Sequence, residues 1–321
     1  MKRFERFERF ERFERFEGFE RFERFEMFRR FRRFAGVAAA IVALLQLAPV
    51  HAQPARDFIW KVSSPAGALY LVGSVHLLTK DYYPLNPALD TAFKDSDLLV
   101  EEADLGELES PVSQFNLLSR GLLPGNQSLD AVVSAATYAL VTKRVSALGM
   151  PMEPLKRFKP WMLAMTLEEL EWQKAGFDAS LGLDRHFYDR AKVDGKRVQG
   201  LETVDYQLSL FDQMTREEQD RMLAESLKDL EREQASVITL TNAWKAGDAA
   251  TVERIVLDDV KDDPLMYERL LVNRNRNWLP TLDALLNRKG RAFVVVGAAH
   301  LVGPDGLLAM FKAKGYKVEQ L

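Results

Sequence analysis

Two histidines of this chain stand in the same local setting, each shortly after an apolar run. The runs are LYLVGSVHLL (69–78) and AFVVVGAAHLV (292–302), and in both a histidine stands three residues after a glycine. The chain has only 4 histidines, so the shared setting of His76 and His300 is notable. Imidazoles act as general bases and as ligands of divalent metals, although either one alone could be a structural histidine. The pair therefore indicates a shared site, provided that the two runs are neighbours in the fold.

Carboxylates end two further predicted strands. DLLVEEA (97–103) contains Glu101 and Glu102, and KRVQGLE (196–202) contains Glu202. Because side chains alternate along a strand, we expect one of the paired glutamates to face the site and the other to face solvent or a helix. Two imidazoles and a carboxylate, with water in the remaining position, form a standard open site for a hydrolytic metal. Glu202 equally fits a charge at a helix N-terminus.

Four more titratable residues are candidates for a supporting role. In the segment LVNRNRNWLP, Arg274 and Arg276 lie two positions apart on a predicted helix and face different ways. An inward arginine needs an anionic partner or substrate, whereas two surface arginines would fit the spacing equally well. In GLDRHF, Asp184 and His186 fit the start of a helix, with Asp184 near the cap.

The elements that must position these residues are predicted at both ends of the folded chain. Strands are expected at 57–62, 68–73 and 97–103, with a helix beginning at Asn86-Pro87, and later a strand at 291–297, a helix at 306–315 and a strand at 316–321. The stretch from about 105 to 290 is mostly helical in pattern, apart from a short strand at 196–202.

This pattern predicts an α/β fold with a mostly parallel, mixed sheet. The sheet is expected to combine two halves, each of the form strand, Gly-x-x-His, helix, strand, separated by the large helical insertion. Gly73 and Gly297 end their strands, where glycine lets the chain turn and a ligand approach the backbone. Ligands of open α/β sheets bind beyond the carboxyl ends of the strands, so both histidines occupy positions where such folds build sites.

The N-terminal part of the chain is expected to lie outside this domain. Residues 1–26 repeat Arg-Phe-Glu, a period of three that gives neither a helix nor a strand a constant apolar face. We interpret them as a low-complexity segment, with Met27 as an alternative start. Residues 27–52 have the basic, apolar and small-residue regions of a signal peptide with cleavage after Ala52. An uncleaved anchor is the alternative, although the apolar region is shorter than the roughly 20 residues of a spanning helix.

The domain is therefore expected to comprise residues 53–321 and to be periplasmic or secreted. The chain has a formal net charge of −3 and no cysteine. The excess of acidic over basic residues argues against nucleic acid as a partner. The lack of cysteine excludes thiolate metal sites, cysteine nucleophiles and disulfides. Any membrane contact would be through an uncleaved signal peptide.

The ordered set of motifs resembles the TraB/GumN family, whose animal relatives are the Tiki metalloproteases. The matching segments cover roughly 57–321, and together they are more specific than any one alone. They are GSVH (73–76), LLVEEAD (98–104), GLD (182–184), GKRVQGLET (195–203), NRNRNW (273–278) and VVVGAAH (294–300).

The resemblance implies a metal-dependent hydrolase with a peptide, or a small ester or amide, as substrate. The ion would be divalent, of the manganese, cobalt or zinc class. Carried over by position, His76 and His300 would hold it, Glu102 would be a further ligand or the general base, and Arg274 would bind a substrate carboxylate or the oxyanion. The supporting residues would be Gly73, Gly297, Glu202, Arg276 and Asp184. A non-catalytic periplasmic protein that binds a peptide, a metal or a haem-like ligand in the same cleft is the alternative.

Overall fold

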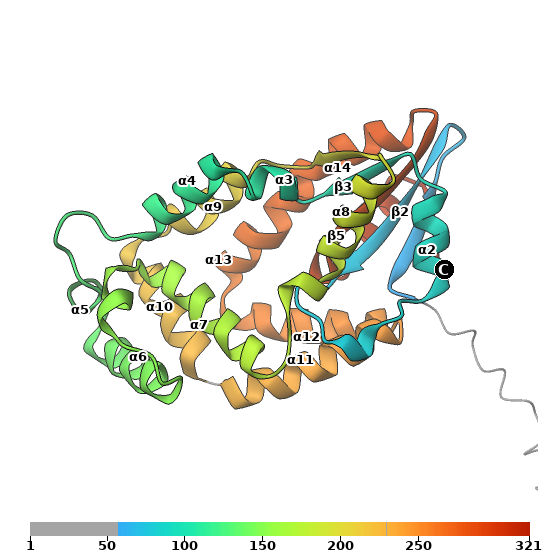
Figure 1. Ribbon diagram of the computed structural model, residues 1–321. Helices are drawn as coiled ribbons and strands as arrows, with labels where there is room; N and C mark the ends of the chain where they lie inside the picture. Colours follow the sequence, from blue (N-terminus) through green and yellow to red (C-terminus); the bar gives the residue numbers. More distant parts are fainter. Residues whose placement is uncertain (1–56, 229) are drawn as a thin grey trace, which may run out of the picture. The chain divides into compact units, whose positions relative to one another are not determined.

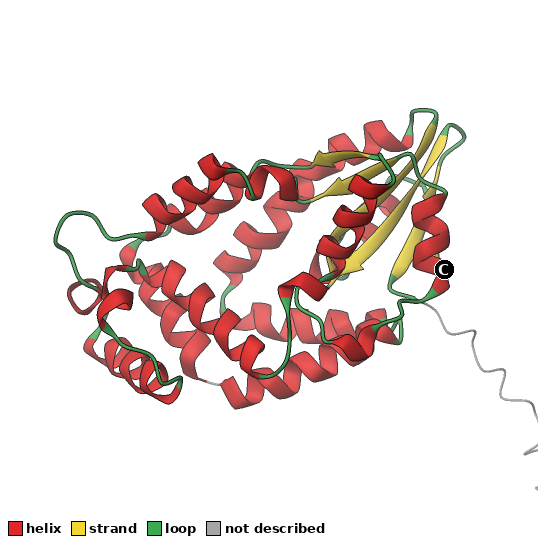
Figure 2. Cartoon of the chain, in the orientation of Figure 1, coloured by secondary structure: helices red, strands yellow, loops and turns green. Residues whose placement is uncertain are grey.

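A six-stranded mixed sheet organises the computed structural model, which describes residues 57–228 and 230–321. The predicted repeat and signal peptide lie outside these residues. In spatial order the strands are β4-β3-β5-β2-β1-β6. Figure 2 shows the strands in yellow among the red helices. Their bounds are β1 Ile59–Ser63, β2 Gly67–Ser74, β3 Leu98–Glu101, β4 Arg197–Gly200, β5 Gly290–Gly297 and β6 Lys317–Gln320.

Five strands of the sheet run in one direction, and β1 runs opposite to them. β4, β3, β5 and β2 form parallel pairs, and β1 pairs antiparallel with both β2 and β6. This arrangement confirms the predicted α/β class with a mostly parallel sheet. In the β2–β5 pair, Ser74 lies opposite Gly297. Because parallel neighbours end at the same edge, both Gly-x-x-His segments leave the sheet side by side.

Helices make up most of the rest of the described chain. The longer ones are α2 Pro87–Lys94, α4 Pro111–Gly121, α6 Ala135–Ala147, α7 Pro160–Lys174, α8 Leu183–Val193, α9 Val204–Asp212, α10 Arg216–Lys228, α11 Leu230–Lys245, α12 Ala249–Asp262, α14 Asn273–Leu286 and α15 Leu307–Ala313. Single turns are α3 Leu105–Leu108, α5 Leu129–Val132, α13 Pro264–Tyr267, the 3₁₀ turns η2 Lys80–Tyr82, η3 Glu153–Arg157, η4 Ala179–Leu181 and η6 Ala298–His300, and the π-helical turn η5 Glu268–Val272. Among the described residues, no helix is long and apolar enough to cross a bilayer.

The main core lies on both faces of the sheet. On one face Phe93 of α2, Phe187 of α8 and Phe293 of β5 contact one another through their rings. Helix α14 contributes Trp278 and Leu282 to the same cluster of buried side chains, and Figure 1 shows α8 in front of the sheet and α14 behind it. Coverage of both faces explains why β5 is an uninterrupted apolar run, as is typical of a parallel strand.

A second core holds the helices between β3 and β4 together with α10. It is built from buried side chains of α6, α7 and α10, including Val141, Leu163 and Leu223. Between this core and the sheet a smaller cluster joins Trp161 of α7 to Val204 and Leu208 of α9. Helices α3 and α9 thereby connect the helical part to the strand ends where the histidines lie.

Glu168 of α7 provides a test of this helical packing. Burial raises its pKa to about 7, against a hydrogen bond with Ser226 that lowers it. Because the unfolded carboxyl titrates near 4.5, the free energy of unfolding should fall as the pH rises from about 4.5 to 7. We expect Glu168→Gln to be about 1 kcal/mol more stable than wild type at pH 8, with a smaller difference at pH 5. Urea unfolding at both values measures this, with exposed Glu169→Gln as control. Equal wild-type and Glu168→Gln stability at pH 8 would refute the prediction.

Candidate functional site

The two strand-end histidines converge beside Gly297. His76 follows β2, and His300 ends the turn η6 directly after β5. A Cβ atom placed on Gly297 would lie 3.7 Å from Nε2 of His76, 3.5 Å from Cδ2 of His300 and 3.3 Å from Oε1 of Glu102. The structure therefore brings His76, Glu102 and His300 together around a position that only a glycine leaves open.

His76 is held through one nitrogen and presents the other to the pocket. Its Nδ1 lies 2.8 Å from Oδ2 of Asp184, which is in the first turn of α8 and also accepts a hydrogen bond from the Ser74 hydroxyl. The charge of Asp184 raises the pKa of His76 to about 9. Because the His76 side chain is 64% exposed, solvent screens this pair and weakens its contribution to stability. The geometry still fixes the ring, with Nδ1–H on the carboxylate and Nε2 towards the pocket.

His300 is buried and neutral. It is only 3% exposed, and burial lowers its pKa to about 3. The Nδ1 atom lies 2.7 Å from Oδ1 of Asn275, and Nη1 of Arg274 lies 3.0 Å from Nε2. Because arginine can only donate, Nε2 accepts and Nδ1 carries the proton. The Asn275 amide group also donates to the backbone oxygen of His300, so this asparagine fixes both the ring and the turn.

Glu102 is an ionised carboxylate at the centre of the cluster. Its Oε1 accepts a 2.7 Å hydrogen bond from the backbone N–H of Gly297, and its Oε2 accepts one of 2.5 Å from Nη2 of Arg274. Burial opposes ionisation, but the neighbouring His300, Arg274 and His76 hold the pKa of Glu102 down to about 2. Since His300 is neutral in this network, the charge of Arg274, followed by that of His76, keeps Glu102 ionised.

Arg274 has no donor left for a substrate. Its Nε and Nη2 reach Oε1 of Glu202 at 3.0 and 2.6 Å, Nη2 also reaches Glu102, and Nη1 donates to His300 and to the backbone oxygen of Leu270. These contacts use all five N–H groups of the guanidinium. Leu270 belongs to the π-helical turn η5, where the usual helical pairing is interrupted. In this arrangement Arg274 positions Glu102 and His300, and its predicted role in binding a substrate carboxylate or the oxyanion stays a prediction.

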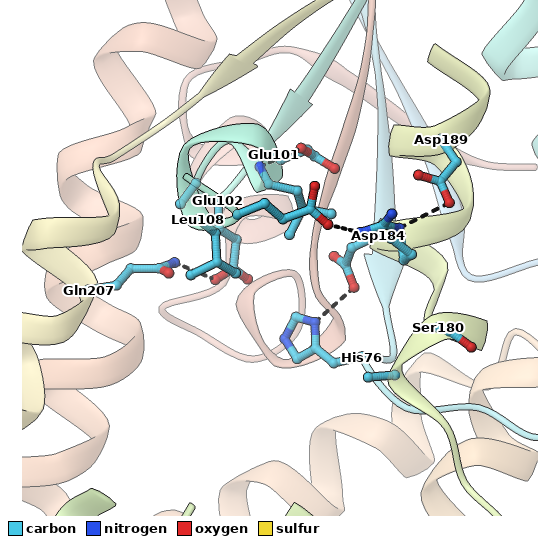
Figure 3. Close-up of a pocket in the computed structure, with 13 residues that line it drawn as sticks. His76, Glu101, Glu102, Leu108, Ser180, Asp184, Asp189 and Gln207 are labelled. Carbon is cyan, nitrogen blue, oxygen red and sulfur yellow. Dashed lines mark hydrogen bonds and ion pairs between the residues drawn. The ribbon is translucent and has the colours of Figure 1, made fainter. Parts of the chain in front are cut away.

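A pocket of about 750 Å³ opens beside His76 and Glu102 of this cluster (Figure 3). It is lined by the ends of β2 and β3, by α3 and by the first turns of α8. Both Glu101 and Glu102 line it, so the expected division of the two glutamates between the site and the other face does not hold. The reason is that β3 ends at Glu101, and the alternation of a strand no longer governs Glu102. Burial, followed by the charge of Asp184, raises the pKa of Glu101 to about 8.

Two sequence candidates lie outside the cluster. The side chain of Arg276 is 56% exposed and pairs with Glu268 at 2.7 Å, on the surface of α14. His186 packs its ring against Tyr83 and Phe187 and does not line the pocket. Of the two arginines, helical geometry therefore turns Arg274 inward and Arg276 outward.

The remaining sequence candidates have structural partners in the cluster. Glu202 accepts from Arg274 and, at 2.8 Å, from the indole N–H of Trp278. A Cβ on Gly73 would lie 2.3 Å from the Phe58 ring, so this glycine is required by close packing. Asp184 holds His76, as described above.

The sequence did not single out several residues that complete the site. Asn275 holds His300, Ser74 holds Asp184, and the amide of Gln207 lies 3.4 Å from Oε2 of Glu102. Asn275 lies inside the motif NRNRNW and Ser74 inside GSVH, so both segments were marked although these residues were not. Gln207 lies outside the motifs, and only the tertiary fold brings it to Glu102.

The chemistry of the cluster suits a divalent metal, although its geometry is not that of a preformed metal centre. Each histidine is fixed through Nδ1 by an oxygen, as metal-ligating histidines usually are. Oε1 of Glu102 lies 3.6 Å from Nε2 of His300, and Gly297 leaves space beside both. In the part of the chain that the structure describes, however, no three His, Cys, Asp or Glu side chains are gathered closely enough to hold an ion. Metal binding would require His300 to exchange its bond from Arg274 for a bond to the ion.

Comparisons with known proteins agree with the motifs. The profile of the TraB/PrgY/gumN family matches residues 58–320. The uncharacterized protein YbaP of Escherichia coli (strain K12) is 26% identical, over 76% of this chain and 87% of that protein. An uncharacterized protein of Treponema pallidum is 22% identical over 79% of this chain and 80% of its own length. A protein of Amphimedon queenslandica described as a metalloprotease TIKI homolog is 22% identical, over 83% of this chain and 61% of that protein. No solved structure shows a significant match.

Proposed function

The chain belongs to the TraB/PrgY/gumN family, and from this premise we propose that it is a secreted or periplasmic metal-dependent hydrolase that acts on peptide bonds. The observation that carries the proposal is the convergence of His76, Glu102 and His300 on the open position beside Gly297. Two imidazoles and a carboxylate are a ligand set used by hydrolytic metals. The relative described as a metalloprotease TIKI homolog supports the same reaction class.

The residues that would hold the ion are His76, His300 and Glu102. When bound, a divalent ion would polarise the substrate carbonyl and lower the pKa of a water molecule. A ligating imidazole must be neutral, so His76 would have to give up its Nε2 proton to hold the ion. Asp184 keeps the ring of His76 in place throughout, and Asn275 does the same for His300.

Glu102 is the group best placed to move a proton. It is ionised and lines the pocket, and its Oε1 is fixed by the N–H of Gly297. If Glu102 is not itself a ligand, it can accept the proton of the attacking water and pass it to the leaving amine. Arg274 keeps the carboxylate ionised, and its own donors stay on Glu102 and Glu202.

The proposed export depends on residues 27–52, which lie outside the described part of the chain. Their basic and apolar regions have the order of a signal peptide. Expression of the full chain in a bacterium with an outer membrane, followed by mass spectrometry of the periplasmic fraction, should give a protein that begins at Gln53.

Metal analysis combined with peptide cleavage tests the proposed activity. We expect purified protein to retain or acquire one manganese, cobalt or zinc ion and to cleave members of a peptide library, with loss of cleavage in chelator and recovery when metal is returned. His76→Ala and His300→Ala should each lose both properties. A metal-replete protein that cleaves no peptide, with both variants binding metal normally, would contradict the proposal. Tight retention of metal or peptide without turnover would instead indicate a binding protein.

A further inference from the structure

Glu101 is a buried carboxyl group whose hydrogen-bonding capacity is largely unused. It ends β3, is 2% exposed and lines the same pocket as His76. Within the described residues its Oε1 has no hydrogen-bond partner, and its Oε2 accepts only a long 3.5 Å contact from the N–H of Leu105. Native proteins rarely leave a buried polar atom without a partner. This carboxyl therefore has room for a donor that the protein itself does not supply.

The other carboxylates that line the pocket already have partners. Arg185 of α8 donates to Glu109 and, at 3.0 Å, to Asp189. Asp184 accepts from His76 and Ser74.

Glu102 is paired with Arg274, which itself does not line the pocket. In the described part of the chain, no lysine, arginine or histidine nitrogen lies within ion-pair distance of Glu101, which takes part in none of the ion pairs found there. Among the described residues that line the pocket, acidic side chains outnumber basic ones, and Glu101 is the acidic side chain without a basic partner.

We propose that the part of the pocket beside Glu101 is a subsite for a cationic group of the substrate, the guanidinium or ammonium of a peptide. A donor-rich cation would supply both the charge and the hydrogen bonds that Glu101 lacks. Leu105, whose N–H faces Glu101, and Leu108 also line the pocket and would contact the methylene stem of an arginine or lysine side chain. Glu101 and His76 line the same pocket, and in Figure 3 Glu101 lies above His76, so a peptide bound in the pocket can contact both. This inference rests on the proposed function, because it names the substrate class of the same pocket.

Equilibrium binding of matched peptides tests the subsite without any need for hydrolysis. The probes are N-acetylated pentaalanine amide with a central arginine, the same peptide with citrulline, and pentaalanine amide with a free or an acetylated N-terminus. Citrulline keeps the shape of arginine but has no charge, and the second pair separates an α-ammonium from a side-chain cation. Titrations are done calorimetrically in chelator with wild type, Glu101→Gln and Glu107→Gln. Glu107 is exposed on α3 and does not line the pocket, so its variant makes the same charge change outside the subsite.

The expected result is a charge preference that depends on Glu101. At least one cationic peptide should bind wild type and Glu107→Gln about 10- to 100-fold more tightly than its neutral twin, as for a buried charged hydrogen bond. In Glu101→Gln this preference should fall to about twofold or less, whereas the neutral twin binds as before, which also shows that the variant is folded. Equal binding of the twins by wild type, a preference that persists in Glu101→Gln, or no binding of either cationic peptide would overturn the proposal. Because chelator prevents metal-dependent cleavage, these outcomes are independent of whether the protein hydrolyses peptides.

Discussion

Arg274→Met is expected to destabilise the fold by about 3–5 kcal/mol, because removal of one partner of a buried ion pair leaves the other charge without compensation. The Arg274 side chain is 10% exposed, and it bridges the carboxylates of Glu102 and Glu202, whose side chains are 13% and 6% exposed. Methionine fills a similar volume but supplies none of the donors. Glu102 would then have to be protonated or remain as an unpaired charge, so its pKa should rise well above its present value of about 2.

Arg276→Met is the matched control, since it makes the same chemical change two residues further along α14. Arg276 is exposed and its pairs with Glu268 and Asp305 lie at the surface. Exposed ion pairs contribute only about 0–1 kcal/mol. Urea unfolding at pH 7 measures both variants against wild type. A difference of less than about 1 kcal/mol between the two variants would contradict the role given to Arg274.

Gly297→Ala is expected to lower kcat/KM by at least about 100-fold while the protein stays folded, because small displacements at a reacting centre have effects of this size. The φ and ψ angles of Gly297, −49° and 137°, suit alanine, so the backbone is not strained. The added Cβ would lie 3.3 Å from Oε1 of Glu102 and 3.7 Å from Nε2 of His76. It would thus fill the space between the groups that the proposed reaction requires.

Gly73→Ala separates this effect from general damage. Its Cβ would meet the Phe58 ring at 2.3 Å, so this variant should lose stability, by about 1–3 kcal/mol for an overpacked core, as well as activity. Peptide cleavage and urea unfolding are measured for both variants. Gly297→Ala with kcat/KM within about fivefold of wild type would show that the space beside Gly297 is not where the chemistry occurs.

The sheet and the meeting of the histidines were predictable because both follow from strand-end positions. The apolar runs before Gly73 and Gly297 have the length and composition of buried parallel strands, and such strands deliver their following residues to one edge. The sequence cannot show that β2 and β5 are immediate neighbours, yet the predicted meeting of His76 and His300 depends on this. In the structure Ser74 pairs with Gly297, which shows that β2 and β5 are immediate neighbours.

The partners of the charged groups were not predictable, because each is set by tertiary packing. Arg274 contacts residues that precede it by 4, 72 and 172 positions and one that follows it by 26. Helical spacing predicts that the side chains of Arg274 and Arg276 point to different sides of the helix, but it does not predict which of them points inward. Asp184 fitted a helix cap equally well, and only the position of α8 beside β2 gives it His76 as a partner. The alternation of side chains along a strand did not predict how Glu101 and Glu102 are placed, because β3 ends at Glu101.

Anomalous diffraction from crystals of residues 53–321 soaked in manganese tests the central claim most directly. The account predicts a single strong manganese peak bonded to Nε2 of His76 and Nε2 of His300, close to Glu102, with Arg274 moved off His300 and still paired with Glu202. Crystals that bind manganese elsewhere or not at all, with the Arg274–His300 hydrogen bond intact, would contradict it.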